Sequence, residues 1–283
     1  MNRLRMAALL LVLLLTVTCG AVAGADDGFF FVQLTDPQMG FTNSNKDVLP
    51  EIEHLTKAVE HINRLKPAFV LISGDMTHAV RDPKQTREFW GIAREIRPEV
   101  PLRFVPGNHD VGKSKAEDVR GYQRIYGKDH YSFSYGGSEF IVLNSPLISD
   151  NSDKDLRDAQ RSWLETELAA AKAKHARHIF VCTHQPWFLE TPNEADKYQN
   201  VPLAYRGAYL DLMDRFGVDY CLSGHLHHTQ EGAYHGVKLV TGGALSKSIA
   251  KPPVVGLNIV KVYKDRVEHK FYGFDEVPHQ VRM

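Results

Sequence analysis

Short apolar runs alternate with amphipathic helical stretches along most of this 283-residue chain, and nearly every apolar run ends in a polar cluster. The runs at 29–34, 68–73, 102–105, 179–183 and 220–222 have the length and content of buried strands. A repeated order of strand, helix and strand builds a largely parallel sheet covered by helices. Ligands of such sheets bind at the carboxyl ends of the strands. The polar clusters therefore mark where a functional site is expected.

Three stretches between these runs carry apolar residues at the three- and four-residue spacing of a helix face. The pair Asp82-Pro83 is a start signal for the second of them. The stripes are Ile52, Leu55, Val59, Ile62 and Leu65; Phe89, Ile92, Ala93 and Ile96; and Trp163, Leu164, Leu168 and Ala171.

Two regions depart from this rhythm. Residues 131–135 and 140–144 flank Gly136-Gly137 and predict a hairpin. Near the end of the chain, residues 237–241, 257–263 and 267–272 predict closing antiparallel strands. The sheet is therefore expected to be mixed, or to be two sheets.

The first 25 residues are expected to be separate from the fold. Arg3 and Arg5 precede an apolar run, and small residues at 21–25 follow it, which is the pattern of a cleavable signal peptide. The alternatives are an uncleaved membrane anchor, for which the apolar run is short, and a lipid on Cys19, whose preceding residues fit poorly. We expect residues 26–283 to form one domain that is exported, periplasmic or secreted, without stable membrane insertion after cleavage.

Charge composition argues against nucleic acid as a partner. The chain has 34 Lys and Arg residues and 34 Asp and Glu residues, so it has no broad basic field. Any attraction for anions has to come from a local site.

Cysteine content predicts no disulfide in the mature domain. Cys182 and Cys221 lie inside two strand-like runs. If those strands are parallel neighbours that end at one site, the two residues are offset by two positions, which is too far for a disulfide. We expect two buried thiols.

Nitrogen and oxygen ligands follow five successive strands. The most concentrated group is Leu222-Ser-Gly-His-Leu-His-His228, in which His225 and His227 would face one side of an extended backbone. His228 is interpreted as incidental in a chain with 14 histidines. Five strand ends with such ligands together predict a metal site. The groups are Asp36 and Gln38; Asp75; Asn108, His109 and Asp110; His184; and His225 and His227.

The spaced motifs resemble those of the calcineurin-like metallophosphoesterase superfamily, D-x-H, G-D, G-N-H-[DE], H and G-H-x-H. The matching segments are Asp36-Pro-Gln38, Gly74-Asp75, Gly107-Asn-His-Asp110, His184 and Gly224-His-Leu-His227. Within the superfamily the chain is similar to the calcineurin-like phosphoesterase domain-containing proteins, whose animal member is a protein serine/threonine phosphatase. The resemblance implies an α/β fold of two packed mixed sheets flanked by helices.

The resemblance also implies roles for these residues. Asp75 would bridge two divalent metal ions. Asp36, Gln38 and His227 would complete one site, and Asn108, His184 and His225 the other. His109, oriented by Asp110, would be catalytic and protonate the leaving alkoxide.

One residue departs from the superfamily pattern, because Gln38 stands where histidine is usual. An amide oxygen is a weaker ligand than imidazole. We therefore expect the first site to accept manganese or magnesium, with iron or zinc also compatible.

The implied reaction is the hydrolysis of a phosphate monoester of a small molecule or peptide by water that the metals activate. Two alternatives stay open: a phosphodiesterase acting on nucleotide or lipid headgroup substrates, and a non-catalytic phosphate-binding protein. The His109-Asp110 pair argues against the second, because binding alone needs no acid.

Two further features have open interpretations. His78 would either line the substrate cleft or be a loop histidine with a structural hydrogen bond. The long segment 185–206 would form a substrate wall or lid, or Trp187 and Phe188 would simply attach it to the core.

Overall fold

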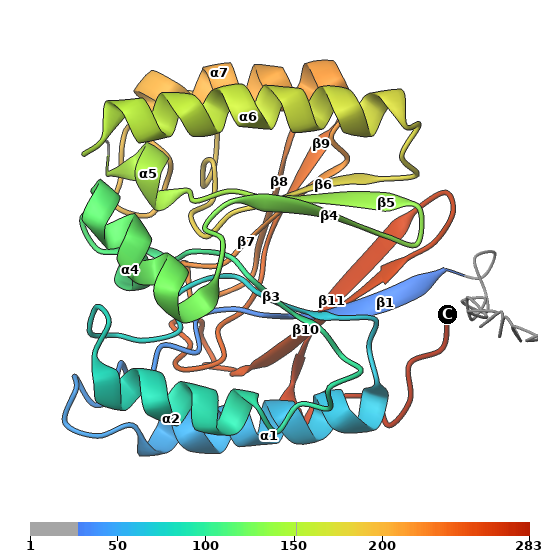
Figure 1. Cartoon of the computed structure of the whole chain (residues 1–283). Coiled ribbons are helices and arrows are strands. Elements are labelled where there is room, and N and C mark those ends of the chain that lie inside the picture. The colour runs from blue at the N-terminus through green and yellow to red at the C-terminus, as the bar shows by residue number, and fades with distance from the viewer. Residues whose placement is uncertain (1–27, 151) are drawn as a thin grey trace, which may run out of the picture.

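The computed structural model describes residues 28–150 and 152–283, which form four layers in the order helices, sheet, sheet, helices (Figure 1). The predicted signal peptide at residues 1–25 lies outside the described residues. Within the described ranges, no helix is both long enough and apolar enough to cross a membrane. The prediction of two packed mixed sheets flanked by helices is confirmed.

The first sheet has five strands in the order β11-β10-β1-β2-β3. The strands β1, β2 and β3 are parallel to one another, β10 is antiparallel to β1, and β11 is antiparallel to β10. The strands are β1 (Phe29–Leu34), β2 (Val70–Ile72), β3 (Leu102–Phe104), β10 (Gly256–Val262) and β11 (Val267–Gly273). A short 3₁₀ helix, η1 (Phe274–Glu276), follows β11.

The second sheet has six strands in the order β4-β5-β6-β7-β9-β8, of which β5, β6, β7 and β9 are parallel. The predicted hairpin is confirmed as β4 and β5. The prediction for residues 237–241 was wrong in part, because β9 is parallel to β7 and antiparallel only to β8, a strand with few apolar residues. The strands are β4 (Tyr131–Tyr135), β5 (Ser138–Val142), β6 (Ile179–Cys182), β7 (Tyr220–Ser223), β8 (Gln230–Tyr234) and β9 (Val237–Thr241).

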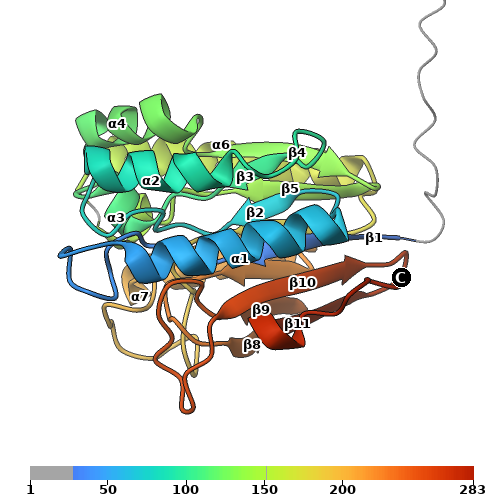
Figure 2. The same ribbon diagram turned by 90° about the horizontal axis from the view of Figure 1, so that it is seen from below.

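Helices cover the outer face of each sheet, as Figure 2 shows for α1 and α2. The three predicted stripes lie on α1, α2 and α6, although Ile96 lies just beyond the end of α2. The apolar stripes of α1 and α2 pack on the first sheet, and α6 and α7 pack on the second. The helices are α1 (Leu49–Leu65), α2 (Pro83–Ala93), α3 (Asn108–Val111), α4 (Ala116–Tyr126), α5 (Pro146–Ser149), α6 (Lys154–Ala173) and α7 (Leu203–Phe216).

A third core fills the space between the two sheets. Successive residues of a strand point to opposite faces, so Phe31 lies in this middle core while Val32 packs under α1. Phe31, Phe140 and Phe180 contact one another across the sheets with ring centroids 4.6–6.2 Å apart. Burial on both faces explains why the strand runs are continuously apolar rather than alternating.

The two cysteines are buried and free, as predicted, but the reason differs from the expectation. Cys221 pairs with Val181, so it is offset from Cys182 by one residue and not by two. Neighbouring positions face opposite sides of a sheet. Cys182 therefore lies in the middle core and Cys221 under the helices.

Candidate metal centre

The carboxyl ends of the parallel strands of both sheets meet at one edge of the molecule. In the first sheet, β1 is followed by Asp36, β2 by Asp75 and β3 by Asn108. In the second sheet, β6 is followed by His184, and β7 by His225 and His227. Hydrogen bonds join the two groups: His184 Nδ1 to the Ser73 carbonyl at 2.8 Å, and the His225 backbone N–H to Asp36 Oδ2 at 2.9 Å. All seven predicted ligands thus belong to one cluster.

The backbone is strained where the ligands lie. Five of the seven predicted ligands have a positive φ, between 35° and 70°: Asp36, Gln38, Asp75, His225 and His227. For residues other than glycine this conformation costs on the order of 1 kcal/mol each and clusters at functional sites. The expectation that His225 and His227 share one face of an extended strand was wrong. Their φ values of 70° and 55° turn them toward different partners.

Each of the three predicted histidine ligands has one ring nitrogen on a backbone carbonyl. The distances are 2.8 Å from His184 Nδ1 to Ser73, 3.2 Å from His225 Nε2 to Tyr198, and 2.7 Å from His227 Nδ1 to Lys247. Each carbonyl accepts a hydrogen bond from the ring N–H, which leaves the other nitrogen of each ring to face the cluster. Such fixing of the tautomer is typical of histidines that bind metals.

The free nitrogen of His184 faces three other ligand atoms. His184 Nε2 lies 3.0 Å from Asn108 Oδ1, 3.0 Å from His225 Nδ1 and 3.3 Å from Asp75 Oδ2. The ligand atoms of Asp75, His184 and His225 all lie within 4.8 Å of one another. Four ligand atoms therefore meet beside the buried Asp75 carboxylate, and a divalent cation bound there would take the place of the proton on His184 Nε2.

A second group adjoins the first. His227 Nε2 lies 3.5 Å from Asp36 Oδ1, and Gln38 Nε2 lies 3.3 Å from Asp75 Oδ2. Asp36 Oδ1 and Gln38 Oε1 are buried and have no hydrogen-bond partner among the described residues. Orphaned buried oxygens of this kind fit a second cation. Asp75 Oδ2 borders both groups, which is the position that the predicted bridging ligand would need.

The electrostatics of the cluster favour a positive charge beside Asp75. Burial alone would raise the pKa of Asp75, but His184 holds it below its ordinary value. Burial lowers the pKa of His184, yet the charge of Asp75 outweighs it and raises that pKa to about 10. Burial, with the charge of His184, lowers the pKa of His225 to about 3. His225 is therefore a neutral imidazole with a lone pair available.

Comparison with known families supports this interpretation of the centre. Residues 31–229 match the model of the calcineurin-like phosphoesterase family, a span that contains all seven predicted ligands.

The chain belongs to the calcineurin-like phosphoesterase family.

Curated relatives match nearly the whole chain. It is 34% identical over 266 residues to the serine/threonine-protein phosphatase CPPED1 of Rattus norvegicus, covering 88% of this chain and 85% of the relative. The Homo sapiens protein of the same name is 33% identical over the same shares of both chains. Two predictions are thereby confirmed: the family, and the class of a dinuclear metal-dependent phosphoric ester hydrolase.

A solved structure shows the same fold at low sequence identity. A dimetal phosphatase from Danio rerio superimposes with a TM-score of 0.66 and 16% identity, covering 88% of this chain and 97% of that chain. The calcineurin-like fold of the described residues is therefore that of the solved structures, with one domain.

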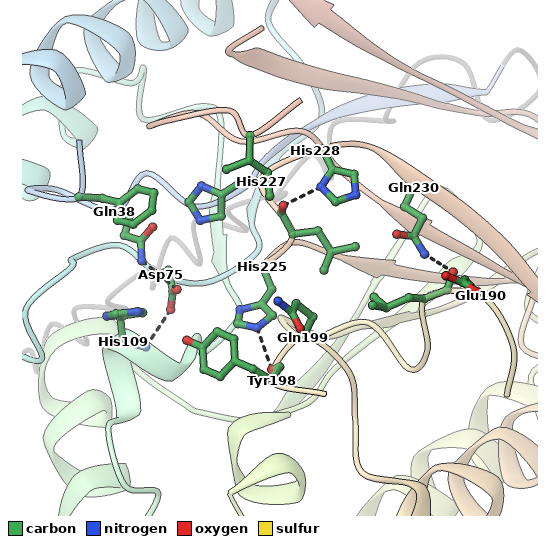
Figure 3. A pocket seen from close by; sticks show the side chains of 14 residues that line it. Gln38, Asp75, His109, Glu190, Tyr198, Gln199, His225, His227, His228 and Gln230 are labelled. Atoms are coloured by element: carbon green, nitrogen blue, oxygen red, sulfur yellow. Dashed lines mark hydrogen bonds between the residues drawn. The ribbon is translucent and has the colours of Figure 1, made fainter. Parts of the chain in front are cut away.

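A cavity of about 560 Å³ opens over the metal centre (Figure 3). Its lining includes Gln38, Asp75, His109, His225 and His227. Apolar residues from four loops also line it: Phe41, Leu189, Leu226 and Ile249. The predicted catalytic His109 therefore shares one cavity with four of the predicted ligands.

His78 holds the ring of His109. The His109 Nδ1 nitrogen lies 2.6 Å from the His78 carbonyl, and the two rings stack with centroids 4.8 Å apart. The carbonyl accepts a hydrogen bond from Nδ1–H, so Nε2 is the nitrogen that can exchange a proton in the cavity. Of the two interpretations of His78, the structure favours the structural one, since its backbone and ring position another residue.

Asp110 does not orient His109, contrary to the prediction. Its side chain is buried and accepts three backbone N–H bonds, with Oδ2 on Asp75 and Gly107 at 2.7 and 2.9 Å and Oδ1 on Met76 at 2.9 Å. The physical reason is that α3 turns its N-terminal end toward the strand end that carries Asp75. Asp110 holds the two ligand loops together and does not face the cavity lining.

We expect Asp110→Ala to lower the free energy of unfolding by about 3 kcal/mol or more, because it leaves three buried N–H groups unsatisfied at about 1–3 kcal/mol each. Urea denaturation of the purified protein measures this. His109→Ala is the matched control in the same helix and should change stability by less than about 1 kcal/mol. If Asp110→Ala kept full stability and lost only rate, the predicted role as a partner of His109 would be restored.

Tyr198 is a site residue that the sequence did not reveal. Its hydroxyl accepts a bond from Asn108 Nδ2 at 3.0 Å, its carbonyl accepts from His225, and its ring lies 5.0 Å from the His225 ring. The residue is 69% exposed at the edge of the cavity. Only its place in the segment 185–206 could have drawn attention to it.

The segment that carries Tyr198 is built as a wall. Trp187 and Phe188 are buried in the core under α6 and α7, as one of the two interpretations had it. Glu194 accepts from the backbone N–H groups of residues 189–191 and from Asn200, and these bonds hold its pKa at about 2 despite partial burial. Arg206 is fully buried and donates to three carbonyls of the segment. The segment thus places Leu189, Glu190 and Tyr198 in a fixed position beside the centre.

Proposed function

We propose that this protein is an exported phosphatase that hydrolyses phosphate monoesters, with phosphoserine and phosphothreonine residues as its substrates. The supporting observation is the position of His109, whose ring is held by His78 with Nε2 free in the cavity over the metal centre. A phosphate-binding protein has no use for a positioned acid. The curated relatives named above are serine/threonine-protein phosphatases.

Two divalent ions held by the predicted ligands would give the cavity a net positive charge. Of the seven predicted ligands only Asp36 and Asp75 are anionic, which is less charge than two divalent ions carry. Two such ions, each of them manganese, magnesium, iron or zinc, would supply Lewis acidity and an activated water. Asp36, Gln38, Asp75 and His227 would hold one, and Asp75, Asn108, His184 and His225 the other.

The residues of the chain supply the rest of the chemistry. The hydroxyl of Tyr198 and the rim of apolar side chains confine the leaving group above the centre. In the imidazolium form of the ring, His109 Nδ1 keeps its proton on the His78 carbonyl while Nε2 gives its proton to the leaving alkoxide, which departs as an alcohol. The backbone N–H of His109 donates to Asp75 Oδ1 at 2.9 Å, so the acid and the bridging ligand keep a fixed spacing.

The test is a substrate screen with the mature protein, stripped of metal and reloaded with one metal at a time. The panel contains 4-nitrophenyl phosphate, phosphoserine and phosphothreonine peptides, nucleotides and diesters. The proposal requires that phosphopeptides are turned over at least as well as diesters. A higher kcat/KM on diesters would support the alternative phosphodiesterase. Phosphate binding without turnover of any ester would support the binding protein.

Export is proposed on the pattern at the start of the sequence. We expect residues 1–25 to be removed and the product to leave the cytoplasm. Amino-terminal sequencing of the native protein measures this, together with its distribution between cytosolic and exported fractions. An intact Met1 on the cytosolic protein would refute it.

A further inference from the structure

A second cavity, of about 380 Å³, lies on the other side of Tyr198 from the metal centre. The loop after α3, the helix α5 and the segment that follows β6 form its walls. Tyr198 lines both cavities, and the predicted metal ligand Asn108 lines the second. A group bound in the second cavity would therefore sit directly beside a phosphate bound at the centre.

Hydrogen-bond donors without partners line this second cavity. Lys113 and Lys197 enter no ion pair within 28–150 and 152–283. Ser149 Oγ is buried and has no partner among the described residues. The one carboxylate in the lining is Asp150. Two lysines against one aspartate leave a net charge of about +1.

Gln185 adds a fourth donor, and its orientation is fixed. Ser145 Oγ accepts from the backbone N–H groups of His184 and Gln185, so its own proton goes to Gln185 Oε1 at 2.5 Å. The amide nitrogen Nε2 is then the free end of a residue that lines the cavity. A cavity that offers ammonium, amide and hydroxyl donors fits an anion with oxygen atoms.

We propose that this second cavity is a specificity subsite that binds an acidic side chain flanking the phosphorylated residue of a peptide substrate. This rests on the proposed function. Tyr198 is the partition between the two sites: its hydroxyl is tied to Asn108, and its exposed ring is the surface over which the peptide crosses. Lys113 and Lys197 pair with the carboxylate, and Gln185 and Ser149 complete its hydrogen bonds.

The experiment compares matched phosphoserine peptides with aspartate, alanine or lysine at the flanking positions. The measured quantity is the ratio of kcat/KM on the aspartate peptide to that on the alanine peptide. We expect the ratio to exceed one in the wild type and to fall about three- to fivefold in Lys113→Ala and in Lys197→Ala, the usual worth of one exposed ion pair. The fall should appear in KM, and the wild-type ratio should shrink as salt is raised.

Two variants sharpen the result. In the double variant Lys113→Glu/Lys197→Glu, kcat/KM should become higher on the lysine peptide than on the aspartate peptide. Lys128→Ala removes a lysine that lines a separate cavity beside β4 and should leave the ratio unchanged. Turnover of all three peptides at equal kcat/KM, unaltered by the lysine variants, would overturn the subsite and leave the proposed function standing. No turnover of any phosphopeptide, with an aryl ester still hydrolysed, would overturn both.

Discussion

Replacing His109 by alanine is expected to slow turnover of phosphoserine peptides by about 10²–10⁴-fold while the metal content stays unchanged. An alkoxide is a poor leaving group and needs the proton that His109 Nε2 supplies. A nitrophenolate leaves readily without a proton. The loss on 4-nitrophenyl phosphate should therefore be clearly smaller, and the two rates measured side by side give the comparison.

The metal content of His109→Ala is the necessary control. The His109 ring donates to His78 and is not among the seven predicted ligands, so its loss should not release metal. If His109 only bound phosphate, both substrates would lose rate by the same factor, mainly through KM. An equal loss would remove His109 from the role of acid.

The second large effect is expected for Asp75→Asn, which should retain far less metal than Gln38→Ala. Asp75 Oδ2 lies 3.3 Å from both His184 Nε2 and Gln38 Nε2, so it borders both predicted sites. It also supplies half of the anionic ligand charge. Loss of a residue that only hydrogen-bonds to a metal ligand already lowers metal affinity about 10–100-fold. Loss of an anionic ligand shared by two ions should lower it further.

Metal per chain after equal dialysis, determined by elemental analysis, measures this difference without reference to activity. Gln38→Ala removes a neutral oxygen from one site and should release at most one metal ion. A folded state in both variants is verified by circular dichroism. Equal losses in the two variants, or full retention in Asp75→Asn, would show that Asp75 does not bridge.

The parallel strands were predictable because each one is marked by residues that are adjacent in the sequence. A short apolar run such as 68–73 is buried on both faces, and the polar residues that follow it lie at the same edge as those of its parallel neighbours. The strand β8 was missed because its sequence QEGAY lies at the edge of the sheet and is only half-buried. The position of β9 beside β7 could not be deduced, because it depends on which edge of β7 is free once β6 has paired.

The side-chain contacts within the centre could not be predicted from any sequence pattern. The residues of the cluster were recognised from their types and spacing, yet Asp110 was assigned to His109 because the two are adjacent in sequence. Helical geometry turns adjacent side chains about 100° apart, so Asp110 faces Asp75 while His109 faces the cavity. The residue that does hold His109 is His78, which acts through a carbonyl that any residue would provide.

The sequence by itself determined the fold class, the family and the set of ligand candidates. The periodicity of apolar residues and the spacing of the motifs can be read from the order of the residues alone. Only the tertiary structure decided which of these residues touch. It brought the strand ends of two sheets together, placed Tyr198 on Asn108 and His225, and opened a second cavity behind it. Those contacts join residues far apart in sequence, and their distances depend on how the two sheets pack, which no local pattern encodes.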